Sequence, residues 1–193
     1  MITAIVQARM GSRRLPGKVL MDICGRPLLW HVIERVKAAT TVEEIVVATT
    51  DKPEDALLRE FLKEQDVRVF LGSEDDVLGR YYQAAKCYSS ETVVRITGDC
   101  PIIDPQLVDE VIGLYQENNV DYVSNTKPPT YPDGLDTEVF SFTALETAYN
   151  KAEKFFEREH VTPFIRTNVQ FRRINYSNET DLSGERWTVD DPE

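Results

Sequence analysis

The chain opens with Ile2-Thr3-Ala4-Ile5-Val6-Gln7, followed directly by Ala8-Arg9-Met10-Gly11-Ser12-Arg13-Arg14-Leu15-Pro16-Gly17-Lys18. Residues 2–7 have the length and apolar character of a buried strand. The segment 8–18 then brings three arginines and one lysine together, and the chain has no acidic residue before Asp22. Because the whole chain has a formal net charge of -11, a basic loop free of carboxylates indicates an anionic ligand.

The residue types of this basic loop, residues 8–18, favour phosphate as the anion. Arginine offers a planar fork to phosphate oxygens, and lysine offers a compact charge. Gly11 and Gly17 let the backbone approach a ligand closely, and Ser12 adds a hydroxyl donor. The loop is not a Walker A motif, because five residues separate the two glycines and Val19 stands where that motif has Ser or Thr. It does not fit G-x-G-x-x-G either. The alternative is an ordinary solvated loop after a first strand.

Length and composition predict a single α/β domain spanning residues 1–193. The chain is 41% hydrophobic and 28% charged, which is ordinary for a soluble globular protein. Its acidic balance argues against nucleic-acid binding, which needs a broad basic surface. No apolar run approaches the roughly 20 residues that span a bilayer, so we expect no membrane association. The N-terminus shows no signal peptide, and three cysteines without metal-ligand spacing fit a reduced, cytoplasmic protein.

Hydrophobic patterning predicts strands that alternate with helices. We expect strands at 2–7, 44–49, 67–71, 92–97, 120–123, 136–141, 171–175 and 186–189, and helices at about 27–36, 51–65, 76–88, 104–114, 143–151 and 153–166. This order predicts a parallel sheet with right-handed crossovers, whose ligands gather at the carboxyl ends of the strands. The segments expected along that edge are 8–18, 49–51, 72–76 and 98–99. Residues 125–135, with three prolines and a glycine, are a candidate substrate loop.

Two aspartates are candidates for a metal site. Asp99 follows an apolar strand and a glycine, and Asp190 follows Trp187-Thr188-Val189 in the same way. Carboxylates brought to one edge of a sheet by separate strands can hold Mg²⁺, which takes one or two carboxylates and completes its octahedron with water and substrate phosphates. The alternative is that both are turn or capping aspartates, a common use of Asp next to Gly or Pro. Asp104, before Pro105, is assigned to a helix cap for that reason.

Five ordered motifs resemble the cytidylyltransferases that make CMP-activated sugar acids, the CMP-Kdo and CMP-sialic acid synthetases. The fuller resemblance is to their relatives in spore coat polysaccharide biosynthesis, the protein F branch. The motifs are the Ala-Arg-x-x-Ser-x-Arg-Leu-Pro-Gly-Lys loop at 8–18, Arg-Ile-Thr-Gly-Asp-Cys-Pro at 95–101, Pro-Asp-Gly-Leu-Asp at 132–136, Glu-His-Val-Thr-Pro at 159–163 and Arg-Trp-Thr-Val-Asp at 186–190. The resemblance implies a three-layer nucleotide-diphospho-sugar transferase fold, Rossmann-like and GT-A-like, with a mixed, mostly parallel sheet.

The resemblance also implies roles for individual residues. It assigns the β- and γ-phosphates of a nucleoside triphosphate to Arg9, Ser12, Arg14 and Lys18. It assigns Mg²⁺ to Asp99 and Asp190, and the base and ribose to the backbone near Ala8 together with Thr97 and Arg80. Arg13 stands where relatives often have Thr, so its role stays open. Thr97 stands where the sugar-acid synthetases tend to have Gln, so base selection stays open as well.

The acceptor side is expected to involve Asp136, Glu138 and His160, which belong to the stretches that resemble the spore-coat relatives. His160 has the chemistry to accept the proton of an attacking hydroxyl. Its alternative role is that of a plain residue at a helix end. Together with Arg9, Lys18 and Asp99, His160 completes the set of residues that we expect to be catalytic.

The resemblance implies an Mg²⁺-dependent nucleotidyltransferase that couples CTP to a sugar or sugar acid and releases pyrophosphate. Two other functions remain open: a metal-dependent glycosyltransferase that consumes a nucleotide sugar, and a non-catalytic nucleotide-binding protein. Glycosyltransferases usually carry an Asp-x-Asp pair, whereas Cys100-Pro101 follows Asp99 here. We expect a homodimer formed through an inserted region at about 125–175. Because a helix normally follows the last motif in this family, we expect that the chain, which stops at Glu193, is truncated or a short form.

Overall fold

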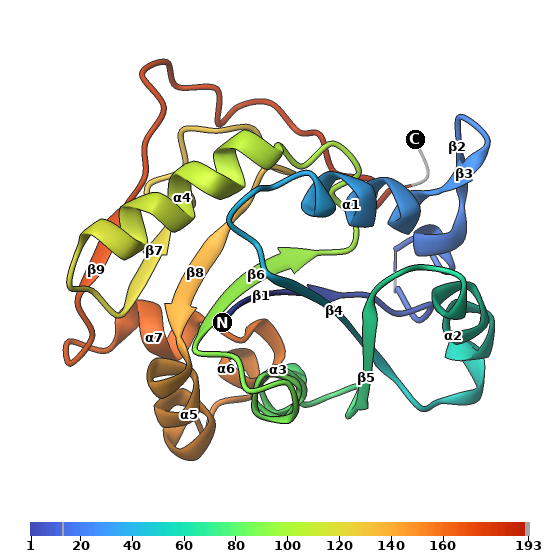
Figure 1. Ribbon diagram of the computed structural model, residues 1–193, viewed down its shortest axis with the longest axis horizontal. Coiled ribbons are helices and arrows are strands. Elements are labelled where there is room, and N and C mark those ends of the chain that lie inside the picture. Colours follow the sequence, from blue (N-terminus) through green and yellow to red (C-terminus); the bar gives the residue numbers. More distant parts are fainter. Residues whose placement is uncertain (13, 192–193) are drawn as a thin grey trace.

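The structure, a computed structural model, describes residues 1–12 and 14–191, so that Arg13 lies outside the described residues. One sheet of seven strands runs through the described part (Figure 1). From one edge to the other its strands are β5 (Arg68–Gly72), β4 (Glu44–Thr50), β1 (Ile2–Gln7), β6 (Thr92–Thr97), β8 (Glu138–Ser141), β7 (Tyr122–Ser124) and β9 (Arg173–Asn175). The expected strand order of a β-α-β protein is therefore present, with the first strand near the centre.

The sheet is mixed and mostly parallel, as predicted. β8 runs antiparallel to both of its neighbours, β6 and β7, and the other neighbouring strands in the sheet pair in parallel. The ladder places Gln7 at the end of β1 opposite Ala48 of β4 on one side and Thr97 of β6 on the other. The carboxyl ends of β1, β4, β5 and β6 consequently lie along one edge, where the sequence predicted the ligand-binding loops.

Helices cover both faces of the sheet and make three layers (Figure 1). One face is covered by α1 (Leu28–Lys37), α2 (Ala56–Lys63) and α4 (Pro105–Glu117). The other face is covered by α3 (Val77–Cys87), α5 (Phe142–Lys151), α6 (Phe155–His160) and α7 (Pro163–Thr167). Short 3-10 turns, η1 (Lys18–Leu20) and η2 (Pro53–Asp55), and a small hairpin of β2 (Asp22–Ile23) and β3 (Arg26–Pro27) complete the described elements.

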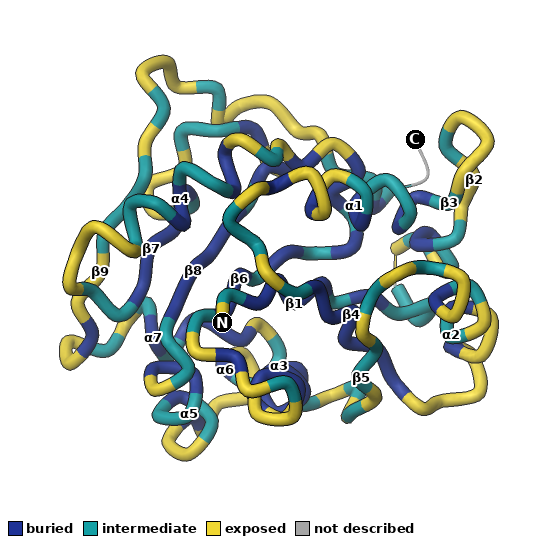
Figure 2. The backbone as a smooth tube through the Cα atoms, in the orientation of Figure 1, coloured by how far each residue is buried: buried dark blue, intermediate teal, exposed yellow. Residues whose placement is uncertain are grey.

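Alternation along the central strands divides the core in two. In β1, Ala4 and Val6 pack among the residues of α1, α2 and α4, whereas Ile5 packs against α3 and α5. Figure 2 shows the buried backbone concentrated in the strands and in the helix turns that face them. Side chains of a strand point alternately to its two faces, so both faces of β1 must be apolar once helices cover them. This burial on both faces fixes the register of β1 against its neighbouring strands, and with it the sheet edge that carries the site.

Helix starts follow the predicted capping chemistry. Asp104 accepts a hydrogen bond from the Gln106 N–H at 2.9 Å, and Pro105 occupies the first position of α4. Asp76 caps α3 in the same way through the Gly79 N–H at 2.9 Å. A carboxylate at this position satisfies a backbone donor that the first helical turn leaves free. Asp104 is thus a structural residue, as the sequence indicated.

The last part of the predicted pattern is confirmed at one segment and wrong at another. The segment 153–166, expected to be mostly helical, forms the two helices α6 and α7, because buried Val161 adopts φ +68 and Pro163 then begins a new helix. The strand expected at 186–189 is wrong. Arg186 makes one isolated bridge to Asp133, in the irregular segment around Gly134, which offers no continuous ladder to pair with.

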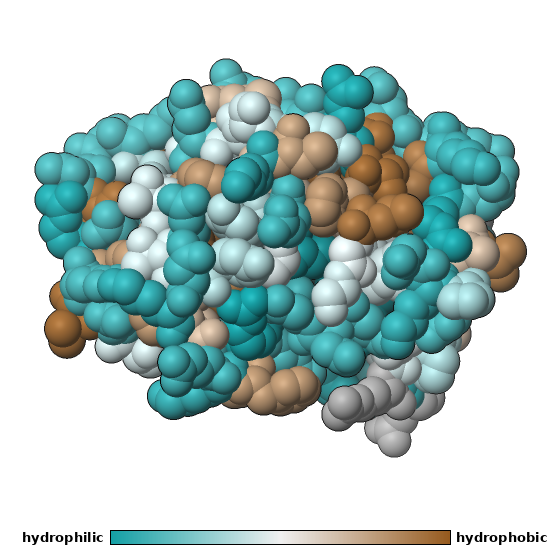
Figure 3. Space-filling view, turned by 90° about the horizontal axis from the view of Figure 1, so that it is seen from below, coloured by the Kyte–Doolittle hydropathy of each residue, from teal (hydrophilic) through white to brown (hydrophobic). Residues whose placement is uncertain are grey.

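The surface agrees with the acidic, charge-rich composition. Figure 3 shows a mostly hydrophilic face on which apolar side chains form separate patches. Among the described residues, none of the helices combines the length and the apolar character that a bilayer crossing requires.

Candidate active site

A cleft of about 310 Å³ opens at the carboxyl edge of the sheet. Its lining residues are Gln7, Ala8, Arg9, Ser12, Arg14, Lys18, Val19, Val77, Arg80, Thr97, Gly98, Asp99, Glu159 and His160. The cleft therefore brings together every residue that was predicted to bind the nucleotide, and it adds His160 from the predicted acceptor side. Clefts at this edge are where open α/β sheets bind ligands.

The basic loop at 8–18 folds back on Met10. The Met10 carbonyl accepts hydrogen bonds from the N–H groups of Ser12 at 2.9 Å and Gly17 at 2.8 Å, and Gly17 has φ +75, which glycine adopts without steric cost. The Met10 N–H in turn donates to the Asp55 carboxylate at 2.6 Å. The local sequence thus closes the loop into a turn that is fixed to η2, and Arg9, Arg14 and Lys18 line the cleft.

Lys18 and Asp99 form the central ion pair of the cleft. The Lys18 ammonium donates to an Asp99 oxygen at 2.7 Å, although Lys18 is only 9% exposed. Burial opposes the ionisation of Asp99, but the Lys18 charge and hydrogen bond outweigh it, so the pKa of Asp99 lies below its usual value. Asp99 is consequently an anion at neutral pH.

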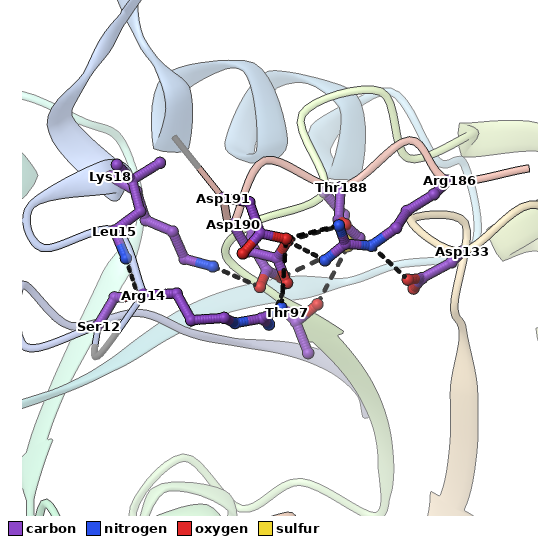
Figure 4. Close-up of polar contacts among 12 residues, drawn as sticks. Ser12, Arg14, Leu15, Lys18, Thr97, Asp133, Arg186, Thr188, Asp190 and Asp191 are labelled. Atoms are coloured by element: carbon purple, nitrogen blue, oxygen red, sulfur yellow. Dashed lines mark hydrogen bonds and ion pairs between the residues drawn. The ribbon is translucent and has the colours of Figure 1, made fainter. Parts of the chain in front are cut away.

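Asp190 lies beside this pair and is held by two arginines, Arg14 and Arg186 (Figure 4). Asp190 is 6% exposed. Arg186 also pairs with Asp191 at 2.7 Å. The Val189 N–H donates to the Asp99 backbone carbonyl at 2.9 Å, which fixes the 186–190 segment against the end of β6. Two chain segments that are distant in sequence therefore deliver their aspartates to one place.

The donor set fits Mg²⁺. Within residues 1–12 and 14–191, no cluster of three or more His, Cys, Asp or Glu side chains has the arrangement of a metal site made by protein ligands alone. Mg²⁺ does not need one, because one or two carboxylates and substrate phosphates are enough to hold it. Asp99 and Asp190 are such a pair, and the cations beside them suit an accompanying polyphosphate.

Arg9 lies on the outer side of the cleft. Its guanidinium donates to Glu74 at 2.8 Å, and Glu74 also pairs with Lys52 after β4. The hydrogen bond and charge of Lys52, together with Arg9, hold the pKa of Glu74 below its usual value against partial desolvation. A single carboxylate thus links the loops that follow β1, β4 and β5, and it positions Arg9.

The inner end of the cleft contains the predicted base-binding residues. Arg80 is 2% exposed, and its Nη1 donates to the Ser73 carbonyl at 2.7 Å. A Cβ at position 72 would lie 2.9 Å from the Arg80 Cγ, so Gly72 makes room for this side chain. The Thr97 hydroxyl contacts the Cys100 sulfur at 3.1 Å. The Ala8 N–H donates to the Ala48 carbonyl at 3.2 Å, which commits that group to the backbone at the sheet edge.

Comparison with known proteins agrees with this geometry. The model of a protein family described as cytidylyltransferase matches residues 3–188. The chain belongs to the cytidylyltransferase family. A solved structure of a cytidylyltransferase from Leptospira borgpetersenii superposes with a TM-score of 0.94 at 36% identity, covering 98% of this chain and 81% of that one. The resemblance that the motifs indicated is therefore confirmed at the level of the family.

Relatives in sequence extend the comparison. The spore coat polysaccharide biosynthesis protein SpsF of Bacillus subtilis is 34% identical over 185 residues, which is 91% of this cytidylyltransferase and 74% of SpsF. An uncharacterized protein of Methanocaldococcus jannaschii is 43% identical over 98% of this chain and 78% of its own length. A CMP-Kdo synthetase solved with CTP has a TM-score of 0.73 at 19% identity, covering 99% of this chain and 93% of that one, which supports the fold.

In this cytidylyltransferase His160, predicted for the acceptor side, ends α6 and lines the cleft. Its ring packs against Phe156 with centroids 4.5 Å apart, and Glu159 lies 3.7 Å from its Nε2. α6 itself is held in place because Arg158 binds Asp76, the cap of α3. His160 is therefore fixed at the mouth of the cleft by the packing of α6.

Asp136 lies next to the cleft without lining it. Burial, together with the charges of Asp133, Glu138 and Asp99, raises the pKa of Asp136 to about 6, while Arg95 acts in the opposite direction. The carboxyl thus changes its charge near neutral pH, unlike Asp99. Its position beside the cleft is compatible with the predicted place on the acceptor side.

Glu138 requires a correction. Its carboxylate is 2% exposed and is fully engaged by Arg95, the Tyr122 hydroxyl and the Thr162 hydroxyl, the last at 2.8 Å. Burial opposes the ionisation of Glu138, but the Arg95 charge and these donors outweigh it, and the pKa of Glu138 is lowered. A carboxylate that is buried and held by three donors from the protein does not face a sugar. Glu138 instead ties β8 to β6, β7 and the segment before α7.

Five further residues line the cleft that had no predicted role, although the segment 98–99 was expected at this edge of the sheet. Gln7, Val19, Val77, Gly98 and Glu159 line the cleft. Gly98 allows the close contact between β6 and β1, because a Cβ there would lie 2.8 Å from the Gln7 carbonyl oxygen. Gln7 could have been recognised in the sequence, because it is the one amide at the end of an apolar strand and directly precedes the basic loop. The signal for Glu159 was its place at the start of the motif at 159–163, next to His160.

Proposed function

We propose that this cytidylyltransferase couples CTP to a hydroxyl of a sugar or sugar acid and releases pyrophosphate, for the synthesis of a surface or spore coat polysaccharide. The observation that carries the proposal is the shared cleft, in which Lys18 and Arg14 of one basic loop contact Asp99 and Asp190. The names of two relatives support the substrate class: SpsF, and a 3-deoxy-manno-octulosonate cytidylyltransferase of Geobacter sulfurreducens that is 41% identical over 61% of this chain and 46% of its own.

In the proposed reaction the acceptor oxygen forms a bond to the α-phosphorus of CTP, and the bond between that phosphorus and the bridging oxygen of the β-phosphate breaks. Pyrophosphate leaves with the electron pair, and the hydroxyl proton passes to a base. Positioning and charge neutralisation supply most of the rate enhancement in such transfers. Arg9, Ser12, Arg14 and Lys18 hold and neutralise the β- and γ-phosphates, which are the leaving group.

Asp99 and Asp190 would hold Mg²⁺, which when bound supplies positive charge to the phosphates. His160, at the mouth of the cleft, is the proposed proton acceptor. Asp136 would contribute a hydrogen-bond partner for acceptor hydroxyls. A pH–rate profile of His160→Gln tests the base: a profile that superposes on that of the wild-type enzyme contradicts the assignment, and loss of the lower limb supports it.

Pyrophosphate release from each of the four nucleoside triphosphates, with and without candidate sugars and sugar acids, tests the function as a whole. We expect release from CTP only when an acceptor is present, and its loss in Asp99→Asn or on addition of EDTA. Release that is insensitive to EDTA contradicts the proposed Mg²⁺ requirement. Transfer from a nucleotide sugar would indicate a glycosyltransferase. Nucleotide binding without release under any condition would indicate a non-catalytic protein.

We also propose a homodimer formed through residues 125–175. A groove of about 530 Å³ supports it; the groove is lined by residues of β7, β9, α6 and α7 together with Lys127. Two phenylalanines at the start of α6, Phe155 and Phe156, remain largely exposed beside it. Light scattering should give twice the monomer mass, and Phe156→Glu should lower it. A wild-type monomer would contradict the proposal.

We propose the cytoplasm as the place of action, because the three cysteines Cys24, Cys87 and Cys100 are free thiols and CTP is an intracellular substrate. Fractionation of cells that express the chain tests this location. Recovery of the enzyme with secreted proteins would contradict it.

A further inference from the structure

Gln7 occupies an unusual position in the cleft. It ends the apolar strand β1 and lines the cleft beside Val77 and Arg80 of α3. Side chains two residues apart in a strand share a face, and Ile5 packs against α3, so Gln7 points to the same side of the sheet. Its cross-strand partners are Ala48 and Thr97, which have shorter side chains, so the Gln7 amide extends further from the sheet than the side chains beside it.

The amide oxygen of Gln7 has an unmet hydrogen-bonding capacity. Gln7 Oε1 is inaccessible to solvent and has no hydrogen-bond partner among the described residues. The Nε of Arg80, which lines the same cleft, is also buried and without a partner in that part of the chain. Buried polar groups are nearly always paired, and leaving one unpaired costs free energy. An acceptor and a donor left open at one end of a ligand cleft are the arrangement expected of a site that is completed by its ligand.

Cytosine and uracil differ at the edge that such groups read. Cytosine presents an exocyclic amine, a donor, next to the ring N3 acceptor, whereas uracil presents a carbonyl and a ring N–H. A carbonyl oxygen from Gln7 accepts from the amine of cytosine and faces another acceptor when uracil is bound. The Arg80 Nε–H is a donor, which fits the acceptor that lies beside the amine.

Neighbouring polar groups, unlike the Gln7 amide oxygen, already have partners within the protein. The Thr97 hydroxyl is engaged with the Cys100 sulfur, and Arg80 directs its Nη1 to the Ser73 carbonyl. The Ala8 N–H is committed to the Ala48 carbonyl. We infer that Gln7 is the specificity-determining residue for the nucleotide base, its amide oxygen selecting cytosine over uracil. This inference rests on the proposed function, because it assumes that the cleft binds a pyrimidine nucleotide.

Equilibrium binding of CTP and of UTP to the full chain, measured by calorimetry, tests the inference without any acceptor. The wild-type protein should bind CTP at least about tenfold more tightly than UTP, the factor that one hydrogen bond to a buried group supplies. Gln7→Leu, of similar size but without the amide, should bring the two dissociation constants close together. Gln7→Glu keeps acceptor oxygens and should retain the preference. Gln83→Leu, the same substitution on the exposed face of α3, is the matched control and should behave as wild type.

Thermal unfolding without ligand separates recognition from a structural role. Because Gln7 Oε1 has no protein partner, Gln7→Leu should melt at or above the temperature of the wild-type protein, while the stabilisation by CTP shrinks. A lower melting temperature together with an unchanged CTP/UTP ratio would overturn the inference. Equal affinity of the wild-type protein for CTP and UTP would overturn it as well.

The pyrophosphate assay keeps the two proposals apart. If CTP and a sugar acid release pyrophosphate and Gln7→Leu keeps the wild-type preference for CTP, the inference fails and the proposed function stands. If Gln7→Leu loses the preference for CTP in binding and no acceptor supports pyrophosphate release, the inference about Gln7 stands and the proposed function fails.

Discussion

Lys18 and Asp99 lie 81 positions apart in the chain, and their side chains meet at 2.7 Å on the inner wall of the cleft. The pair joins the basic loop after β1 to the end of β6, and Arg14 joins the same loop to Asp190. Arg9, which contacts Glu74, Arg14 and Lys18 thus each have an anionic neighbour. These ion pairs within the protein position the charges of the site, which lowers the cost of bringing them together.

Lys18→Met should lower kcat for pyrophosphate release from CTP by about 10²–10³-fold, the usual loss when one preorganised charge or donor at developing negative charge is removed. Pyrophosphate release measured at saturating CTP checks this. Lys63→Met, which removes an exposed lysine from the outer face of α2, is the control and should leave kcat unchanged. Wild-type kcat in Lys18→Met would remove the basic loop from the mechanism.

Asp136→Asn should make the protein more stable at pH 7.5. A folded-state pKa of about 6, above the reference 3.8, means that the folded protein binds the proton more tightly than the unfolded chain, so wild-type stability falls as pH rises between these values. Two pKa units correspond to at most about 3 kcal/mol, and partial exposure reduces the gain to about 2 kcal/mol.

Urea unfolding of Asp136→Asn and wild type at pH 4 and pH 7.5 measures this difference. The variant's advantage should be much smaller at pH 4, where Asp136 is protonated in the folded state and close to half protonated in the unfolded chain. The exposed Asp66→Asn is the control and should follow the wild-type pH dependence. An advantage of the same size at both pH values would show that burial of charge at Asp136 is not its source.

Glu138→Gln should destabilise the fold by about 3 kcal/mol, because it leaves the Arg95 guanidinium buried without its counter-charge. Burial of Arg95 is offset in the native protein by Glu138, which raises the pKa of Arg95 above its usual value. The double variant Arg95→Met/Glu138→Leu should recover much of the loss, since neither charge then remains buried. Denaturant unfolding measures both, and a single variant as stable as wild type would contradict this account.

Gly134→Ala should lower both stability and kcat. Gly134 has φ +113, and a Cβ there would lie 2.8 Å from the Trp187 carbonyl carbon. The substitution must therefore strain the backbone, at a cost of about 1–3 kcal/mol, and displace the segment that carries Asp190. Gly113→Ala in α4, where a Cβ meets nothing within 4 Å, is the matched control and should be neutral or stabilising. Melting temperatures and pyrophosphate release check both.

Much of the fold could be predicted because local and global signals agree. Ile2–Gln7 and Thr92–Thr97 read as buried strands, and they are neighbours in the sheet. Parallel strands bring their carboxyl ends to one edge, so the loops at 8–18 and 98–99 had to meet. The cleft follows from this rule together with the resemblance of the motifs.

The errors and the missed detail come from contacts between residues that are distant in sequence. Glu138 looked available for a sugar because nothing in its own motif shows that Arg95, 43 positions earlier, occupies its carboxylate. The break between α6 and α7 depends on the positive φ of Val161, which hydrophobic spacing does not indicate. The 186–189 segment has strand-like residues, but its partner is an irregular loop. Each case is a tertiary contact that overrides a local pattern.

The place of β1 near the middle of the sheet bears on how the chain is made. Ile2–Gln7 is synthesised before Glu44–Thr50 and Thr92–Thr97, the two strands with which it pairs. An apolar strand with two open edges must therefore wait in the nascent chain until Thr92–Thr97 has emerged. During that interval the strand that later supports the basic loop exposes unpaired backbone groups to which other chains can bind.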